Sequence, residues 1–577
     1  MGTISDKLMR IINTKEDIRK ALISKGYDVP TSIPFKEYAK MILDLPCKVD
    51  SFPDIEGIVA RYSASGLTNE QMAANPVWVD KTGNGHDLQL KNFAWKGMSG
   101  VGGYVADIDE WGTNSTAAYF ERNSIKITAT FKENVSLGLL YHNIKLRQSC
   151  VLKVTGIPEG CDAFLDDRLG NRFYMSEDGV YEIIPSNFLA EALYFSIEKY
   201  PERWYGSKLT IEQLPLYPGA LVFDGVDDYG VCDNFPILTK EKGYTVVVLR
   251  QWITYNPNAI SAIATNASDQ SFNGAFTFEN YNKGAEQTIS YGATQISLQY
   301  SKSPFSWQTT SKYNGFNIAN GNKDATNSLV LGRSYPQRNE FANFAIWELV
   351  FLDHDATEEE LTKIKDYFVK TYPWLFPDQA WTVVGKTNED EDRATIANIT
   401  GNGNDLVLSN FGFAEGSGYN EEGEYAGYLV TDGVDDKIIS SIFKMGNDWT
   451  VIGDWELINT GKNDNAGIVK FDSIVIYNYN YNYNSVLINI KNGRNISIPD
   501  QNTVNAICSD GRIYSKDWKE SIYNEETEST SKNFLTIGYS GNAYTKIAFK
   551  NLAIYPTVLS REDCIKAYNY LQTLKAK

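Results

Sequence analysis

The chain has 577 residues, more than one hydrophobic core can hold, and a formal net charge of −18 at pH 7. This charge, with no block of Lys and Arg, argues against nucleic acid or an anionic membrane as a partner. No apolar run approaches the ~20 residues that a membrane helix needs. The 13% of aromatic residues and the 44 Gly are typical of β-rich proteins.

The cysteines and histidines, which could form disulfides, bind a metal or catalyse a reaction, are few and scattered. The six cysteines form no CxxC pair, so we expect free thiols in a chain that folds in a reducing cytoplasm. The opening MGTISDKL is polar and carries no signal-peptide pattern, which agrees with cytoplasmic folding. Three histidines, far apart in sequence, offer little material for a His-rich metal site or for His-based catalysis.

Residues 1–50 differ from the rest and predict two short helices. Thr14 and Asp17 can cap the first helix, Gly26 would end it, and Pro34 can begin the second. Helices of about 10 residues are marginal alone, so these need a partner. We expect an attachment and oligomerisation segment, and the alternative is a helical cap on the next domain. The apolar positions that would make the contacts are Ile18, Leu22, Ile23, Phe35, Tyr38 and Ile42.

From about residue 52 the pattern becomes β and repeats itself. Residues 80–88 read DKTGNGHDL, and residues 398–406 read NITGNGNDL. Further matches follow in the same order: LQLKNFAW with LVLSNFGF, VFDGVDDYG with VTDGVDDKI, GYTVVVLRQW with DWTVIGDWEL, and LVLGR with LTIGY. Each copy then closes with a capped helix, TEEELTKIKDYF (357–368) or SREDCIKAYNYL (560–571). These ordered matches indicate a duplicated domain.

The spacing of the matches indicates an inserted domain. Asp87 and Asp224 lie 137 positions apart in the first copy, whereas Asp405 and Asp432 lie 27 apart in the second. The difference of 110 residues is the size of a domain, so we expect residues 112–218 to form a smaller β-sandwich inserted into a loop. Its predicted strands are SIKITATF, SCVLKVTGI, GVYEIIP and KLTIEQLPL.

The repeated motifs resemble those of laminin-G-like modules of the concanavalin-A type. Such modules carry D-x-[ST]-G-N-G, then F-D-G-V-D-D-Y, then a late strand before an acidic-capped helix; the first copy matches all three. The second copy departs from them at Asn398 and Thr431. The resemblance implies a mainly β fold of two concanavalin-A-like (laminin-G-type) jelly-roll β-sandwiches, at residues 51–111 with 219–375 and at residues 376–577.

A second resemblance covers the N-terminus and the end of the insert. The stretches INTKEDIRKALISKGYDVP (12–30), IPFKEYAKMI (33–42) and TIEQLPLYPGALVFDGVDDYG (210–230) are similar to virion proteins from tailed phages of gut Bacteroidales, including the crAss-like group. Such proteins are often labelled head or tail fibres. The resemblance implies a protein on the virion surface that contacts capsid or tail proteins through residues 1–50. It also implies a homo-oligomer, a trimer first and a dimer second.

The residues of the TGNG turn predict a calcium-binding site as one of two alternatives. Asp80, Asn84 and Asp87 offer carboxylate and amide oxygens, which Ca²⁺ prefers, and the DGVDD carboxylates would approach from a neighbouring strand. The alternative is a purely structural turn, because Asx residues stabilise turns without a metal and the second copy lacks the first Asp. Ca²⁺ is the one cofactor for which the sequence offers candidate ligands.

Two aromatic segments are candidates for glycan binding. In YNYNYNYN (477–484), strand alternation would put Tyr477, Tyr479, Tyr481 and Tyr483 on one face, where they would stack on sugar rings. The alternative is a Tyr face that covers the sandwich. Trp204 and Tyr205 in PERWYGS are further candidates, again with a packed aromatic as the alternative.

The sequence offers no convincing pair of catalytic acids. A glycosidase needs two facing carboxylates about 5–5.5 or 6.5–9.5 Å apart, whereas DIDEW (107–111) and NEDEDR (388–393) are typical of solvated loops. We therefore expect a non-enzymatic phage virion protein, a fibre or a capsid or tail decoration, that adheres to host-surface or mucus glycans. The alternatives are a polysaccharide depolymerase (glycoside hydrolase) and an architectural decoration without a ligand.

Overall fold

The structure is a computed structural model in which the chain divides into two compact units, Met1–Asp54 and Ile55–Lys577. It describes Lys15 and residues 52–577, except 114, 133–138, 145–149, 184–192, 239–242, 255–262, 268–276, 279–294, 301–303, 306–324, 334–339, 415, 424, 442, 444, 459–466, 472–473, 480–484, 491–493, 500–503, 516–517, 519, 523–534, 541–542 and 577. The predicted attachment residues Ile18, Leu22, Ile23, Phe35, Tyr38 and Ile42 lie outside the described residues.

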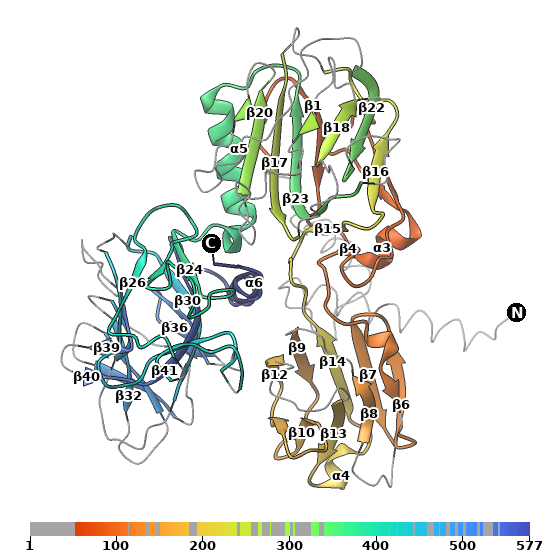
Figure 1. Cartoon of the computed structure of the whole chain (residues 1–577). Helices are drawn as coiled ribbons and strands as arrows, with labels where there is room; N and C mark the ends of the chain where they lie inside the picture. Colours follow the sequence, from red (N-terminus) through yellow and green to blue (C-terminus); the bar gives the residue numbers. More distant parts are fainter. Residues whose placement is uncertain are drawn as a thin grey trace, which may run out of the picture. The chain divides into compact units, whose positions relative to one another are not determined.

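The first sandwich takes its strands from both sides of the insert (Figure 1). They are β1 (Ile58–Ser63), β2 (Val77–Trp78), β3 (Leu88–Lys91), β4 (Gly100–Val101), β15 (Leu221–Asp224), β16 (Tyr229–Cys232), β17 (Thr245–Trp252), β18 (Ala264–Ala267), β19 (Thr277–Phe278), β20 (Gln295–Tyr300), β21 (Pro304–Phe305), β22 (Ala325–Leu331) and β23 (Asn343–Leu352). One sheet has the order β21-β20-β17-β23-β15-β4 with β1 also on β23, and the other has β19-β18-β22-β16-β3-β2. Apolar side chains from both sheets meet in one core.

The insert is a smaller sandwich of two antiparallel sheets. Its strands are β5 (Gly112–Thr113), β6 (Ala118–Arg122), β7 (Lys126–Phe131), β8 (Leu139–Ile144), β9 (Cys150–Thr155), β10 (Asp162–Asp166), β11 (Arg172–Met175), β12 (Gly179–Ile183), β13 (Leu193–Glu198) and β14 (Lys208–Gln213). The orders are β12-β9-β14-β7-β6 and β11-β10-β13-β8-β5. The core also holds Ile108 from the 3-10 turn η1 (Ile108–Glu110) and Trp111, so the DIDEW segment anchors the entry into this sandwich.

The second sandwich lies wholly beyond residue 378. Its strands are β24 (Gln379–Thr382), β25 (Thr395–Ile396), β26 (Leu406–Ser409), β27 (Gly418–Tyr419), β28 (Leu429–Val430), β29 (Lys437–Ser440), β30 (Thr450–Leu457), β31 (Gly467–Phe471), β32 (Ile474–Tyr479), β33 (Ser485–Ile490), β34 (Arg494–Pro499), β35 (Val504–Cys508), β36 (Arg512–Ser515), β37 (Glu520–Ile522), β38 (Thr536–Ile537) and β41 (Ile547–Tyr555), with the small hairpin β39 (Tyr539–Ser540) and β40 (Ala543–Tyr544). The sheets run β27-β28-β41-β30-β35-β36-β37, with β24 on β41, and β25-β26-β29-β38-β31-β32-β33-β34.

The two larger sandwiches repeat one strand order. The path β20-β17-β23-β15-β4 corresponds to β35-β30-β41-β28-β27, and β18-β22-β16-β3-β2 corresponds to β31-β38-β29-β26-β25. Even an irregularity recurs, because β17 shifts register on β23 after Leu249 and β30 shifts on β41 after Asp454, the fifth residue of each strand. The ordered sequence matches therefore correspond to a repeated architecture.

The helices begin where the sequence predicts. Helix α5 (Glu358–Thr371) starts after Thr357, whose side chain forms the predicted capping box with Glu360. Helix α6 (Arg561–Gln572) starts after Ser560, which accepts a bond from the backbone N–H of Asp563. The shorter helices are α3 (Asn69–Ala74), α4 (Pro201–Trp204) and η4 (Pro373–Leu375). Among the described residues, no helix is both long enough and apolar enough to cross a membrane.

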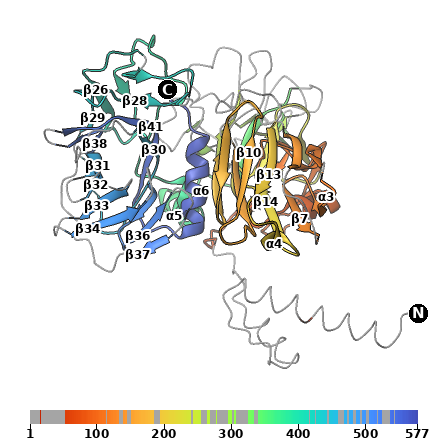
Figure 2. The same cartoon turned by 90° about the horizontal axis from the view of Figure 1, so that it is seen from below.

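Helix α6 connects the parts of the unit Ile55–Lys577. It packs alongside β30 and β41 (Figure 2). Its Asn569 side chain donates to the Pro215 carbonyl at the exit of the insert, and the hydroxyl of Tyr568 donates to Glu182 on β12 of the insert at 2.9 Å. The side chain of Gln251 on β17 reaches Thr573, just after α6, at 2.9 Å. All three sandwiches thus contact one C-terminal segment.

Candidate functional site

The first TGNG turn is held by acceptors that are already in use. The Asp80 carboxylate accepts bonds from the backbone N–H groups of Arg61 and Thr82, each at 3.0 Å, and from the Thr82 hydroxyl at 2.8 Å. The backbone N–H of Asp80 donates to Asp87 at 2.8 Å, and the Asn84 amide donates to the Val59 carbonyl. The three candidate calcium ligands therefore each build the turn itself.

The second TGNG turn makes the same bonds around an amide. The oxygen of Asn398 accepts from the backbone N–H of Thr400 at 3.0 Å, and the backbone N–H of Asn398 donates to Asp405 at 2.8 Å. The bonds to the Oδ1 atom are the same in both turns, whereas the Asn398 amide N–H donates to the Gly403 carbonyl and the Asp80 carboxylate accepts from the His86 N–H. The turn therefore needs an oxygen acceptor at this position and no charge. This supports the structural alternative, and calcium at Asp80, Asn84 and Asp87 stays a prediction.

The DGVDD loops bring three carboxylates together in each copy. Ligand atoms of Asp224, Asp227 and Asp228 lie within 4.8 Å of one another, and so do those of Asp432, Asp435 and Asp436. In the first loop, Asp228 accepts from the Ser99 hydroxyl at 2.9 Å and from the backbone N–H of Asp224 at 3.0 Å. Burial raises the pKa of Asp228 to about 7 and that of Asp436 to about 6. The loop's own backbone and the Ser99 hydroxyl thus hold the buried carboxylate.

Replacing Ser99 with alanine should lower the free energy of unfolding by about 1–3 kcal/mol, since the buried Asp228 carboxylate loses its hydroxyl donor and the Ala94 N–H loses its acceptor. Ser417 makes the same two contacts, to Asp436 and to Gly412 N–H, so Ser417→Ala should behave alike. Chemical denaturation measures both, with the exposed Ser65→Ala as control. Equal stability of all three variants would contradict the shared role.

A cavity of about 450 Å³ lies between the insert and the second sandwich. The insert contributes the segment from Phe173 to Glu182, and the second sandwich contributes Asn505 on β35, Trp518 after β36 and Tyr568 on α6. Strands β11 and β12 are edge strands of different sheets, so the chain crosses between the sheets at this point.

Aromatic rings form much of the cavity wall. Phe173 and Tyr181 pack edge to face with ring centres 6.2 Å apart, and Trp518 and Tyr568 do so at 5.6 Å. Tyr174 is 46% exposed, so one ring of the wall is accessible to solvent. Such rings give a ligand flat apolar surfaces, while the polar lining residues give it hydrogen-bond partners.

A buried charge cluster stands behind the cavity. The Lys550 ammonium lies 3.3 Å from Glu182 and 3.5 Å from Asp454, and each of these three side chains is at most 13% exposed. Burial raises the pKa of Glu182, although Lys550 and the Tyr568 hydroxyl offset part of this effect. Burial lowers the pKa of Lys550, but Glu182 and Asp454 outweigh burial and raise it overall. The lysine therefore stays charged and holds the two domains' carboxylates together.

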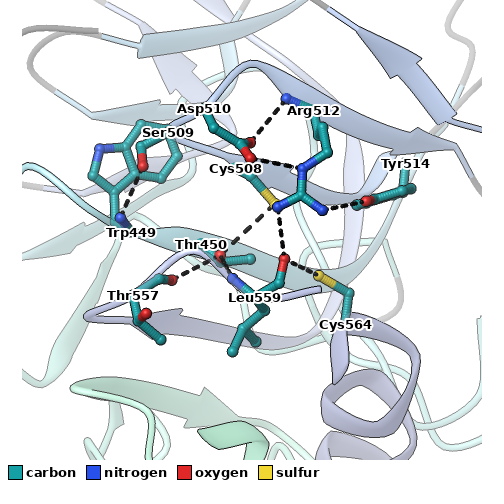
Figure 3. A network of polar contacts seen from close by, with 10 residues as sticks. All are labelled: Trp449, Thr450, Cys508, Ser509, Asp510, Arg512, Tyr514, Thr557, Leu559 and Cys564. Carbon is teal, nitrogen blue, oxygen red and sulfur yellow. Dashed lines mark hydrogen bonds and ion pairs between the residues drawn. The ribbon is translucent and has the colours of Figure 1, made fainter. Parts of the chain in front are cut away.

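Figure 3 shows the contacts of Arg512, which begins β36 of the second sandwich. Its guanidinium donates to the Tyr514 hydroxyl at 3.1 Å and to the Leu559 carbonyl at 3.0 Å, which ties β36 to the segment before α6. Arg561, the first residue of α6, donates to the Trp518 carbonyl at 3.2 Å. The ring of Trp518 is thus positioned by the same contacts that attach α6.

The side chains that were predicted to bind glycans differ in their exposure. Trp204 is 1% exposed and packs against Phe131 in the core of the insert, so the glycan contact predicted for it is wrong and the packed alternative holds. Tyr205, at the C-cap of α4, is 36% exposed. Tyr477 and Tyr479 both belong to strand β32. Tyr481 and Tyr483 lie outside the described residues.

Sequence reasoning missed the residues of the cavity. The segment 172–182 reads RFYMSEDGVYE, with aromatic and acidic residues on both sides of an SEDG turn. This concentration of aromatic and acidic residues was the one feature of the insert's sequence that could have indicated a binding site. Trp518 and Tyr568 lie more than 300 positions further along, and no sequence pattern links them to it.

Comparisons with known proteins give distant likenesses only. No family model matches the chain, and no curated protein matches its sequence. Among solved structures, the botulinum neurotoxin type G receptor binding domain is similar at 13% identity over 33% of this chain and 50% of that one, with a TM-score of 0.21. The VIP36 exoplasmic/lumenal domain, in a Ca²⁺/Man3GlcNAc-bound form, has 10% identity over 26% and 87%, with a TM-score of 0.18. A Trypanosoma rangeli sialidase in complex with sialic acid has 9% identity over 79% and 83%, with a TM-score of 0.22.

The chain spans about half the length of the first two matched structures, the neurotoxin domain and the binding domain of Paraclostridial Mosquitocidal Protein 1. At TM-scores near 0.2, none of these likenesses supports a conclusion about ligand or activity. What stands on the described residues is a mainly β chain of several antiparallel sheets, with one aromatic and acidic cavity between two of its sandwiches.

Proposed function

We propose that this chain is a non-enzymatic virion protein of a tailed phage, a fibre or a capsid or tail decoration, that adheres to host-surface or mucus glycans. The observation that carries the adhesive role is the cavity between the insert and the second sandwich, where aromatic rings stand beside carboxylates and an amide. Rings of this kind stack on the apolar faces of sugars, and acceptors of this kind bond sugar hydroxyls. In this proposal the two larger sandwiches are laminin-G-type jelly rolls, which their common strand order supports.

A glycan array tests the adhesive role. The full chain is applied to host-surface and mucus polysaccharides, and the eluates are assayed for reducing ends. We expect retention on part of the array without release of reducing ends. Release would favour the polysaccharide depolymerase instead. Retention on none of the polysaccharides, while antibodies still label the protein on virions, would favour an architectural decoration.

Residues 1–50 are proposed to attach the protein to capsid or tail proteins and to hold the copies together. We expect the full chain to be a trimer, or failing that a dimer, and a chain beginning at residue 51 to be a monomer, as measured by light scattering. Linked copies would multiply weak sugar binding by avidity. Two monomers of identical shape would contradict this role for the segment.

A further inference from the structure

We propose that Cys508 and Cys564 form a reversible disulfide when hydrogen peroxide oxidises the folded chain, and that this bond fastens helix α6 to the second sandwich. The five described cysteines are free thiols. Cys508 ends strand β35, and Cys564 lies near the start of α6, so a bond between them joins the sheet to the C-terminal helix. The inference concerns the second sandwich alone and does not depend on the proposed glycan adhesion.

Both sulfur atoms lie beside the segment that leads into α6 (Figure 3). The Thr450 hydroxyl donates to the Cys508 sulfur at 3.7 Å and accepts from the backbone N–H of Leu559 at 2.9 Å. The Cys564 thiol donates to the carbonyl of the same Leu559 at 4.0 Å. The two thiols also interact with each other through a side-chain hydrogen bond. They are therefore neighbours in the reduced chain, before any bond forms.

The surroundings make Cys508 the thiol that reacts first. Hydrogen bonding to Cys564 lowers the pKa of Cys508, burial opposes this, and the Thr450 hydroxyl and the Arg512 guanidinium lower the pKa further, so that it falls below its ordinary value. Hydrogen bonding to Cys508 and burial raise the pKa of Cys564. Because the thiolate is the nucleophile, Cys508 attacks the oxidant and Cys564 stands beside it as the resolving thiol.

The position of the pair suits a small oxidant. Cys508 and Cys564 are both almost fully buried. The Arg512 side chain lies beside Cys508, is 24% exposed and pairs with the Asp510 carboxylate at 2.7 Å, on the solvent side of this network (Figure 3). Cys508 is thus separated from solvent by one partly exposed side chain. Movement of that side chain admits hydrogen peroxide and leaves larger reagents outside.

The reaction balances in two steps. The Cys508 thiolate attacks one oxygen of hydrogen peroxide, so an S–O bond forms, the O–O bond breaks, and the leaving hydroxide takes the proton that Cys508 had released to become water. The Cys564 sulfur then attacks the Cys508 sulfur, so the S–S bond forms, the S–O bond breaks, and the leaving hydroxyl takes the Cys564 proton as a second water. Two thiols are oxidised and one peroxide is reduced.

The bond would stabilise the attachment of α6. Cys508 and Cys564 lie 56 positions apart in the sequence, so a link between them removes freedom from the unfolded chain. In the folded chain it prevents α6 from leaving the sheet to which it is attached. Tyr568 and Asn569 of α6 contact Glu182 and Pro215, so oxidation would hold these contacts as well.

The test treats the full chain with hydrogen peroxide, alkylates the remaining thiols after unfolding and digests the protein with trypsin without reduction. We expect mass spectrometry to find the peptide 495–512 joined to the peptide 562–566 as the main oxidation product, and dithiothreitol to separate them. The unfolding midpoint should rise by about 5–10 °C on oxidation and return on reduction. Burial raises the pKa values of three further thiols, which serve as internal controls and should stay alkylated: Cys150, Cys161 and Cys232.

Cys564→Ala separates the two roles. Without the resolving thiol, Cys508 should stop at the sulfenic acid, which dimedone labels. Cys150→Ala is the matched control, because it removes a buried thiol from the insert and should leave the disulfide unchanged. The joined peptides of the unaltered chain decide the proposal even where a variant fails to fold.

Three results would overturn the proposal. If dimedone labels Cys508 in the unaltered chain and the two peptides stay separate, Cys564 is not the resolving thiol. If Cys508 is oxidised no faster than Cys150, the pair is not reactive. If the disulfide forms but the unfolding midpoint does not change, the bond does not fasten α6.

Discussion

Replacing Lys550 with methionine is expected to lower the free energy of unfolding by about 3–5 kcal/mol. Lys550 bridges Glu182 of the insert and Asp454 of the second sandwich, and all three side chains are almost fully buried. Its removal would leave two carboxylates close together in a low-dielectric interior with no cation between them. The interface that forms the cavity would then loosen, because the same Glu182 also accepts the Tyr568 hydroxyl bond from α6.

Chemical denaturation followed by Trp fluorescence measures this loss. Lys363→Met is the matched control, because Lys363 pairs with Glu359 on the exposed face of α5 and such surface pairs contribute about 0.3–0.5 kcal/mol. Adding Glu182→Gln and Asp454→Asn to Lys550→Met should restore part of the stability, since the unpaired charges disappear. A loss below that of the Lys363 control would refute the bridging role.

Gly156→Ala is expected to destabilise the insert by about 2–5 kcal/mol, from the left-handed backbone and the overpacking together. Gly156 follows β9 with a φ of +91°, and a Cβ atom there would lie 1.7 Å from the backbone carbonyl oxygen of Lys208 on β14. Since that oxygen belongs to the paired strand, the two strands must separate or the turn must change. The turn is in addition fixed by Asp178, which accepts from the N–H groups of Gly156 and Ile157.

Gly206→Ala separates the two causes. Gly206 also has a positive φ, +70°, but a Cβ atom there would meet nothing within 4 Å. This variant should therefore lose only the conformational part, about 1–2 kcal/mol. Hydrogen exchange of the β9 and β14 amides locates the damage in the Gly156 variant. Equal losses in both variants would show that the close approach to Lys208 has no energetic effect.

The elements that the sequence predicted best are those with a local cause. The TGNG turns follow from Gly and Asx chemistry, and the helix starts follow from Thr357 and Ser560, so both could be placed from a few residues. Strands β7 and β14 alternate buried and less buried residues, which is the pattern that predicted them. The strands of the opposite sheet of the insert were harder to predict from the sequence. Strand β10, for example, is buried at all five positions and shows no alternation.

The cavity lay beyond sequence reasoning for a different reason. Its walls come from residues 173–182 and from Asn505, Trp518 and Tyr568, which meet only because the insert and the second sandwich pack together. Trp204 illustrates the same limit: the PERWYGS segment left glycan contact and core packing open, and the ring fills the core against Phe131. Exposure is a tertiary property, and neither composition nor spacing determines it.

An experimental structure of the full chain with the most strongly retained saccharide tests the central claim most directly. We predict that the saccharide lies in the cavity between the insert and the second sandwich, with one sugar ring against Tyr174. A saccharide bound only on other surfaces, with the cavity filled by solvent, would contradict the account.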